Sequence, residues 1–297
     1  MFGNVTIIFA FAAMIAWGIG DFLVQKTVRK LGNFETLIWI NFIAGLGLLP
    51  FVFKDIHLIK SLHNFLWLLL LGVVDFFFGV ILLKAYEKGK LSVVEAVMIF
   101  ELPLTIVLGM VFFSEKLTLS QFVCILTILS GIFLASKKHM TFLEKIISAF
   151  GGKINFFEKG AILALIAAAL SAFYNFFIAV NSREVTPIIA IWFPWVFSLM
   201  FLLLYVCHKK GFLAFLSESA KYKNLILWTG IINTAAWVFY SVALKDNALS
   251  ITTAITESYV IISIYLGLKV NKEKISIFQY LGSALAFVGS LILGFIS

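Results

Sequence analysis

The chain has 297 residues, of which 62% are hydrophobic and 13% are charged, and its formal net charge is +8. Soluble domains average about 45–50% apolar and about 25% charged residues, so this chain has too few polar groups to cover a water-facing surface. The composition excludes a soluble globular protein. Because Lys and Arg cluster in the short connections between apolar stretches, their excess indicates membrane topology and lipid headgroups, not nucleic-acid binding.

Apolar segments of membrane-spanning length follow one another along the whole chain. About 20 apolar residues in a helix cross the roughly 30 Å of a hydrocarbon core. We predict ten spans, at 5–26, 34–53, 65–86, 91–113, 118–136, 160–181, 187–207, 224–244, 249–270 and 275–295. The predicted fold class is therefore an all-α membrane protein with ten transmembrane helices.

One longer connection divides the ten spans into two sets of five. We predict a first five-helix repeat at 1–138, a linker at 139–158 and a second five-helix repeat at 159–297. The apolar side chains of the linker fall on one helical face, which predicts an amphipathic helix lying in the membrane interface.

The two sets of five are copies of each other. A shift of 158 positions places Leu249–Lys274 on Leu91–Lys116 without a gap. The identical pairs include Leu91/Leu249, Ser92/Ser250, Gly109/Gly267, Glu115/Glu273 and Lys116/Lys274. Because five is odd, the second copy enters the membrane from the opposite side. Such an inverted repeat is typical of secondary transporters, whose substrate site lies between the halves near the midplane.

Carboxylates occur inside the spans, where lipid does not tolerate them. A charge at the bilayer centre costs from about 2.5 to more than 10 kcal/mol, so these groups face a cavity or a partner. Amide and aromatic side chains accompany them at helical spacing or at matching positions of the second repeat. We predict a substrate-binding cavity formed by Asp21, Asp75, Glu101, Glu257, Trp17, Asn175, Tyr174, Asn233, Trp237, Tyr240 and Tyr259.

A structural role is the alternative for each of these groups. Polar side chains also hold membrane helices together, at about 1 kcal/mol each, and aromatic stripes often pack or face lipid. For Asn175 and Asn233 the sequence does not decide between the two roles. Glu115 and Glu273 lie at span ends, each followed by Lys, and are expected to cap tight turns.

Several stretches carry a family resemblance. They are AWGIGDFLVQK (16–26), AYEKGKLS at the end of the third span, FSEKLTLSQF (113–122), LSAFYNFF (170–177) and NKEKISIFQYLG (271–282). On these residues the chain resembles the drug/metabolite transporter superfamily, in its ten-helix EamA-type branch. The resemblance implies membrane transport, with both termini in the cytoplasm. One departure is Ile261, which stands where the first repeat has Pro103, so the two halves need not bend alike.

The basic residues give a different orientation. Of the Lys and Arg residues, 18 lie in or beside the odd-numbered connections and 5 in the even-numbered ones. The positive-inside rule then places the chain in the cell membrane with both termini outside. Charge count and family resemblance therefore disagree on orientation.

Acids beside aromatic faces favour a cationic substrate, through Coulomb attraction and cation–π contacts of about 0.5–2 kcal/mol each. We expect alternating-access transport of a small amine-bearing metabolite, such as an amino acid or a quaternary ammonium compound. A desolvated carboxyl group holds its proton more tightly, which makes a proton the candidate coupling ion. No cofactor or metal is expected, the partners are the substrate and the lipid bilayer, and a monomer suffices.

Two other functions compete with this prediction. An anionic cargo such as a nucleotide sugar needs Lys or Arg near the midplane, and the sequence offers none there. The GIGD string at 18–21 matches the GxGD of intramembrane aspartyl proteases, with Asp75 as its imagined partner. In those enzymes the second Asp lies in the preceding helix and a Pro-Ala-Leu motif follows. Neither feature is present, so we do not predict an enzyme.

Overall fold

The computed structural model describes residues 3–88, 94, 97–98, 100–135, 159–259, 261–262, 265–266 and 277–296. Within these ranges the chain is helical and contains no strand. The predicted linker at 139–158 lies outside them. The helices are α1 (Gly3–Leu31), α2 (Asn33–Val52), η1 (Ile56–Lys60), α3 (Leu62–Lys88), α5 (Glu101–Phe112), α6 (Leu119–Ala135), α8 (Lys159–Glu184), α9 (Pro187–Lys210), α10 (Phe212–Ala220), α11 (Lys223–Asp246), α12 (Leu249–Thr256), η3 (Glu257–Tyr259) and α14 (Ile277–Ile296).

Six described helices are long and apolar enough to cross a membrane: α1, α2, α3, α8, α9 and α11. Shorter apolar helices lie at Glu101–Phe112, Leu119–Leu134 and Ala284–Ile296. Local sequence explains where several helices begin and end. Gly32, at φ 101°, makes the tight turn between α1 and α2, a conformation that glycine adopts at little cost. Pro187 occupies the first position of α9, where its missing N–H is not needed.

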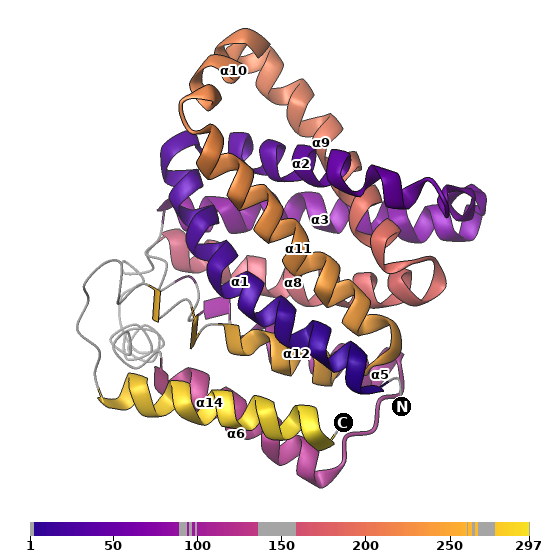
Figure 1. Cartoon of the computed structure of the whole chain (residues 1–297), viewed down its shortest axis with the longest axis vertical. Coiled ribbons are helices and arrows are strands. Elements are labelled where there is room, and N and C mark those ends of the chain that lie inside the picture. The colour runs from indigo at the N-terminus through magenta and orange to yellow at the C-terminus, as the bar shows by residue number, and fades with distance from the viewer. Residues whose placement is uncertain are drawn as a thin grey trace.

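The two halves of the chain interlock. The most extensive contacts between described helices pair α1 with α11, α3 with α8, α2 with α9 and α6 with α14. Each pair joins the first half to the second. With the shift of 158 residues, α1 corresponds to α8 and α3 to α11, so the first two pairs are equivalent under exchange of the halves. The contact pattern thus fits a molecule built from two copies of one unit (Figure 1).

Small residues bring α6 and α14 close together. A Cβ added to Gly131 would lie 2.5 Å from the Ala286 nitrogen and 2.7 Å from the Gly282 oxygen. The equivalent Gly289 packs on Ile128, at 3.0 Å from an added Cβ. Without a hydrophobic driving force between helices in lipid, close backbone approach of this kind supplies the packing.

The spans predicted at 91–113 and 249–270 are interrupted. Phe100 is in a turn directly before α5, and its N–H donates to the Val97 oxygen at 3.2 Å. In the second repeat α12 ends at Thr256 and the 3-10 turn Glu257–Tyr259 follows. The two breaks lie at equivalent positions, although Pro103 is present in one copy only. Glu101 and Glu257, at these two positions, line the cavity described below.

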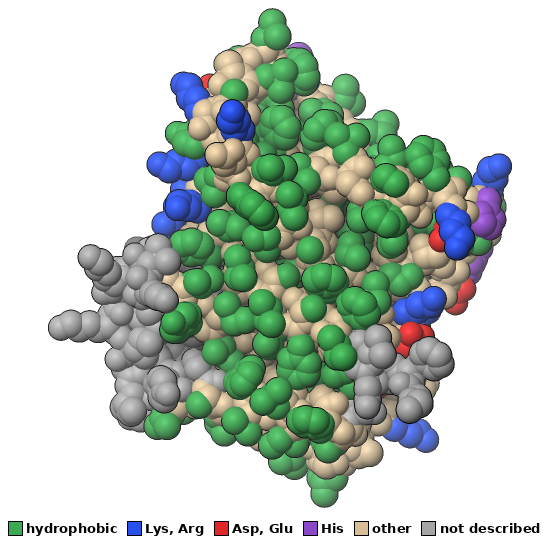
Figure 2. All heavy atoms as spheres, in the orientation of Figure 1, with side chains coloured by type: hydrophobic (Ala, Val, Ile, Leu, Met, Phe, Trp, Pro, Cys, Tyr) green, Lys and Arg blue, Asp and Glu red, His purple; other side chains and the backbone are tan. Residues whose placement is uncertain are grey.

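Charged side chains lie at two opposite ends of the molecule, with a broad hydrophobic region between them (Figure 2). We call one end the terminal end: it carries both chain termini and the connections 53–61, 113–118, 185–186 and 247–248 (Figure 1). The opposite end, where α1, α3 and α6 finish and α8 and α14 begin, is the linker end. This arrangement is that of a multi-pass membrane protein.

Candidate functional site

A cavity of about 80 Å³, partly open to the outside, lies between the two halves. Its described lining is Trp17, Asp21, Val24, Leu37, Ile40, Asn41, Asp75, Phe78, Gly79, Leu82, Leu83, Tyr86, Met98, Glu101, Ser171, Tyr174, Trp195, Asn233, Trp237, Glu257 and Tyr259. Four of these residues are acidic, and none of the described lining residues is Lys, Arg or His.

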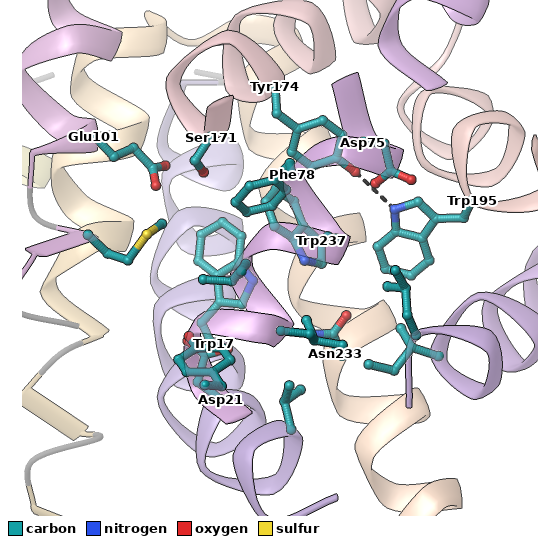
Figure 3. Close-up of a pocket in the computed structure, with 18 of the residues that line it drawn as sticks. Trp17, Asp21, Asp75, Phe78, Glu101, Ser171, Tyr174, Trp195, Asn233 and Trp237 are labelled. Atoms are coloured by element: carbon teal, nitrogen blue, oxygen red, sulfur yellow. Dashed lines mark hydrogen bonds between the residues drawn. The ribbon is translucent and has the colours of Figure 1, made fainter. Parts of the chain in front are cut away.

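Asp75 is held by residues of the second half. The Ser198 hydroxyl donates to its Oδ2 at 2.5 Å, and Tyr174 and Trp195 are its other hydrogen-bonding neighbours. The Trp195 indole N–H donates to the Tyr174 hydroxyl at 2.9 Å (Figure 3). α3, α8 and α9 therefore fix the orientation of the carboxyl group, which is 7% exposed.

Glu101 is the first residue of α5, lies in the cavity wall and is 5% exposed. The Asn175 amide of α8 donates to its Oε1. The Oδ1 of the same amide has no hydrogen-bond partner among the described groups. The bond to Glu101 is therefore the one hydrogen bond made by the Asn175 side chain within the described part of the chain. Asn175 does not itself line the cavity.

An aromatic cluster occupies the middle of the site (Figure 3). Trp17 of α1 meets Trp237 of α11 edge-on, with ring centroids 4.7 Å apart. Trp237 in turn lies 5.0 Å from Tyr174, and Phe78 stacks on Tyr174 at 5.3 Å. The rings come from α1, α3, α8 and α11, so both halves of the chain build one apolar surface.

Acidic groups surround this aromatic cluster. In Figure 3, Asp21 lies beside Trp17, Asp75 beside Tyr174 and Trp195, and Glu101 on a third side near Ser171. Glu257 begins the 3-10 turn after α12 and also lines the cavity. A cation between these groups meets negative charge from several directions and the faces of Trp and Tyr rings.

Nine of the eleven residues predicted for the site line the cavity. The other two stand behind it: Asn175 contacts Glu101, and the Tyr240 hydroxyl hydrogen-bonds to that of Thr253 at 2.7 Å. Tyr240 also packs on Trp17, with ring centroids 5.0 Å apart.

Sequence reasoning left Asn41, Ser171 and Trp195 out of the predicted site. Asn41 is 1% exposed, and its Nδ2 has no acceptor among the described groups. A polar amide in the middle of an apolar span was the available signal for Asn41. Ser171 and Trp195 gave no comparable signal, because serine and tryptophan occur on all faces of membrane helices.

The described lining of the cavity extends toward the linker end and does not reach the connections at the terminal end. Val24, Leu83 and Tyr86, from the linker-end parts of α1 and α3, belong to its lining. At the terminal end, Arg183 donates to the carbonyl oxygens of Leu244 at 3.2 Å and Asn247 at 2.9 Å.

Glu115 also lies at the terminal end, and here the sequence prediction is wrong. Its carboxylate does not cap a turn of its own segment but reaches the first residues of α12 in the other half. It does so because the polypeptide turns toward α12 directly after α5.

No group of three or more His, Cys, Asp or Glu side chains in the described part of the chain could hold a metal ion. Comparison with curated proteins gives no match. Among solved structures, 27 chains match. One crystal structure superimposes with a TM-score of 0.71 over 98% of this chain and 98% of its own, at 14% identity. That similarity shows a shared fold.

Two consecutive stretches of the sequence match one family model, that of the EamA-like transporters, at residues 4–137 and 158–295. Together they cover most of the chain and divide it as the repeat does. Members of this family are membrane transporters and not enzymes. The chain therefore belongs to the EamA-like transporter family of the drug/metabolite transporter superfamily, and it is a multi-pass membrane transporter.

Proposed function

We propose that this transporter carries a small metabolite that bears a positively charged amine group, by alternating access. The single observation behind the proposal is the charge of the cavity: four carboxyl groups and no basic side chain among its described lining residues. Moving charged groups out of water is costly, so a cation that neutralises them is favoured over an anion. A nucleotide sugar or another anionic cargo finds no basic partner among these residues.

We further propose that the path is built as ten spans in two inverted five-helix repeats, 1–138 and 159–297, joined by a linker at 139–158. The contact pattern between the halves and the two equivalent helix breaks support this arrangement. In such folds the broken helices line the substrate site and the halves rock around it. Glu101 and Glu257 flank the two breaks.

The roles of the cavity residues follow from their positions. Asp21, Asp75, Glu101 and Glu257 supply the negative charge, and Trp17, Tyr174, Trp237 and Tyr259 supply ring faces and edges. Asn233 offers an amide from α11, and Asn175 and Tyr240 hold Glu101 and Trp17 in place. One of the acids exchanges a proton during the cycle.

The Asn41 Nδ2, which has no acceptor among the described groups, favours an amino acid over a quaternary ammonium ion as substrate. A buried donor without an acceptor costs about 1–3 kcal/mol. An amino acid brings a carboxylate that accepts from Asn41 Nδ2 while its ammonium group lies among the acids.

The test starts with a thermal-shift screen of the purified protein against amino acids, amines, nucleosides and sugars, since a ligand that binds the folded state stabilises it. Uptake of the ligand found is then measured in proteoliposomes for Asp21→Asn, Asp75→Asn, Glu101→Gln and Glu257→Gln. We expect a loss of about tenfold or more in uptake, because one charged contact contributes about 1.5–3 kcal/mol. Glu184→Gln, on the exposed surface of α8, is the matched control.

Unchanged uptake in all four variants contradicts the assignment, and selective stabilisation by anionic ligands contradicts the cationic substrate. Proton coupling is tested by imposing a pH gradient across the proteoliposome membrane. Uptake that is the same with and without the gradient contradicts it.

A further inference from the structure

The Glu115 carboxylate joins the two halves of the molecule at the terminal end. Its Oε1 accepts from the Leu249 backbone N–H at 2.6 Å. Its Oε2 accepts from the Ser250 N–H at 3.0 Å and from the Ser250 hydroxyl at 2.6 Å. Three hydrogen bonds thus connect one side chain of the first half to the first turn of α12. We call Glu115, Leu249 and Ser250 together the Glu115 latch.

The backbone after α5 is shaped for this contact. The N–H groups of Phe113 and Glu115 both donate to the Gly109 oxygen, at 3.0 Å and 3.3 Å. Ser114 between them has a positive φ of 53°, which non-glycine residues adopt at a cost and which marks a constrained turn. A Cβ on Gly109 would lie 2.6 Å from Glu115 Oε2 and 2.8 Å from the Ser250 hydroxyl. Glycine at this position therefore leaves the space that the latch occupies.

The latch lies at the far ends of the two half-helices that carry cavity carboxylates. α5 begins with Glu101 in the cavity and ends just before Glu115. α12 begins at the latch and is followed by Glu257 in the cavity. All eight residues of α12 are buried, and at 1.5 Å per residue the helix is about 12 Å long. A shift of Glu257 therefore displaces the latch end of α12 as well.

We propose that Glu115 is a positioning residue of the transport cycle: its contacts with Leu249 and Ser250 keep the terminal end closed, and their release opens it. Substrate contact with Glu101 and Glu257 shifts the equilibrium between the formed and the released latch, and α5 and α12 transmit this effect. This proposal rests on the chain being a transporter and not on the charge of its substrate. The repeat places identical residues at Leu91, Ser92, Gly267 and Glu273, all of them outside the described residues.

A purely stabilising helix cap is the competing role, because a carboxylate at a helix N-terminus favours the folded state whatever the helix does. The two roles differ in what breaking the latch exposes. Breaking a cap that only stabilises lowers the melting temperature. Breaking a latch that closes one end also admits water to the residues beneath it, at temperatures far below melting.

The test measures access to Thr253, which is fully buried in α12 between the latch and Glu257. A Thr253→Cys reporter is placed in a background with Cys124→Ala and Cys207→Ala, reconstituted in nanodiscs so that both ends meet solvent, and labelled with N-ethylmaleimide. With Glu115→Gln we expect the labelling rate to rise about tenfold, the factor that corresponds to about 1.4 kcal/mol. Glu115→Asp, which keeps the charge but is shorter, gives an intermediate rate. Glu184→Gln at the same end leaves the rate unchanged.

A second reporter separates opening of one end from general loosening. Ser171→Cys lies in the cavity wall and is 2% exposed. Its labelling does not rise in Glu115→Gln if only the terminal end opens, whereas a loosened protein labels faster at both positions. An unchanged rate at Thr253→Cys, or equal increases at both reporters, overturns the proposal.

Ser250→Ala serves as the milder variant if Glu115→Gln does not fold. It removes one of the three hydrogen bonds, and we expect a smaller but measurable increase at Thr253→Cys. No increase in that variant also overturns the proposal. Neither reporter requires substrate, so failure here is distinguishable from failure of the cationic-substrate proposal.

Discussion

At the scale of single residues, two deep carboxylates of the first half, Asp75 and Glu101, find partners in the second. Asp75 is bound by Ser198, and Glu101 by Asn175. The sequence identified all four acids because a charge in a membrane span is costly wherever it lies. It did not predict Ser198 as the partner of Asp75, because that contact crosses 123 positions of the chain. Pairing at such separation depends on the packing of α3 against α9 and not on any local pattern.

Replacing Ser198 by Ala tests the Asp75 network. The variant leaves the buried carboxylate without one donor, and we expect it to lower the free energy of unfolding by about 1–3 kcal/mol. Thermal unfolding of the purified protein measures the change. Ser217→Ala, on the exposed surface of α10, is the matched control and is expected to melt like the parent. Equal melting temperatures for both variants would show that Ser198 is not needed to hold Asp75.

Asn41 distinguishes ligands that carry an acceptor from those that do not. In Asn41→Leu we expect amino acids to stabilise the protein less than they stabilise the parent, while simple amines stabilise both equally. The reason is that only the former use the Nδ2 donor, which has no acceptor among the described groups. Thermal shifts with matched pairs of an amino acid and its decarboxylated amine give the comparison. An equal loss for both members of a pair would remove Asn41 from the recognition of the acceptor.

At the scale of helices, the repeat predicted more than the hydropathy did. The shift of 158 residues placed Gly131 and Gly289 at equivalent positions, and both lie where α6 meets α14. Hydropathy predicted the spans 91–113 and 249–270 but not the turn at Phe100 or the 3-10 turn Glu257–Tyr259 within them. A turn of helix that opens toward a cavity keeps its apolar composition, so composition cannot reveal it.

Gly131→Ala is the element-scale prediction. The added methyl group meets the backbone of α14 at Gly282 and Ala286, which cannot move without moving the helix. Overpacking of this kind costs about 1–3 kcal/mol, and we expect a lower melting temperature. Gly47→Ala in α2 is the control, because nothing lies within 4 Å of its added Cβ. That substitution is expected to be neutral or slightly stabilising, since alanine favours a helix. Equal effects at both sites would argue against a tight crossing of α6 and α14.

At the scale of the whole molecule, two halves of one chain pack against each other, and residues of both halves line the cavity. The sequence predicted this arrangement through its repeat, its odd number of spans and its mid-membrane acids. The substrate and the direction of transport are not encoded in any of these features. They depend on the shape of the cavity and on which end faces the cytoplasm.

The charges of the molecule predict an orientation in the membrane. The described members of the 18 basic residues beside the odd-numbered connections, among them Lys30, Lys88 and Lys221, lie at the linker end, and the positive-inside rule predicts that this end faces the cytoplasm. In intact cells, an impermeant maleimide is then expected to label a cysteine at Lys245, at the terminal end, but not one at Lys221. Labelling at Lys221 alone would reverse the orientation and agree with the placement of both termini in the cytoplasm.

The partners of Asp75 and Glu101 lie in α8 and α9, and this has a consequence for biosynthesis. Tyr174 and Asn175 are translated about a hundred residues after Asp75, which at 5–20 residues per second takes roughly 5–20 s. During that interval the nascent first half holds acids whose native donors do not yet exist. The newborn helices must keep these groups near the headgroups, or against the insertion machinery, until the later segments arrive. Expression of the first half alone should therefore yield a product that quality-control proteases remove quickly, and co-expression of the second half should rescue it.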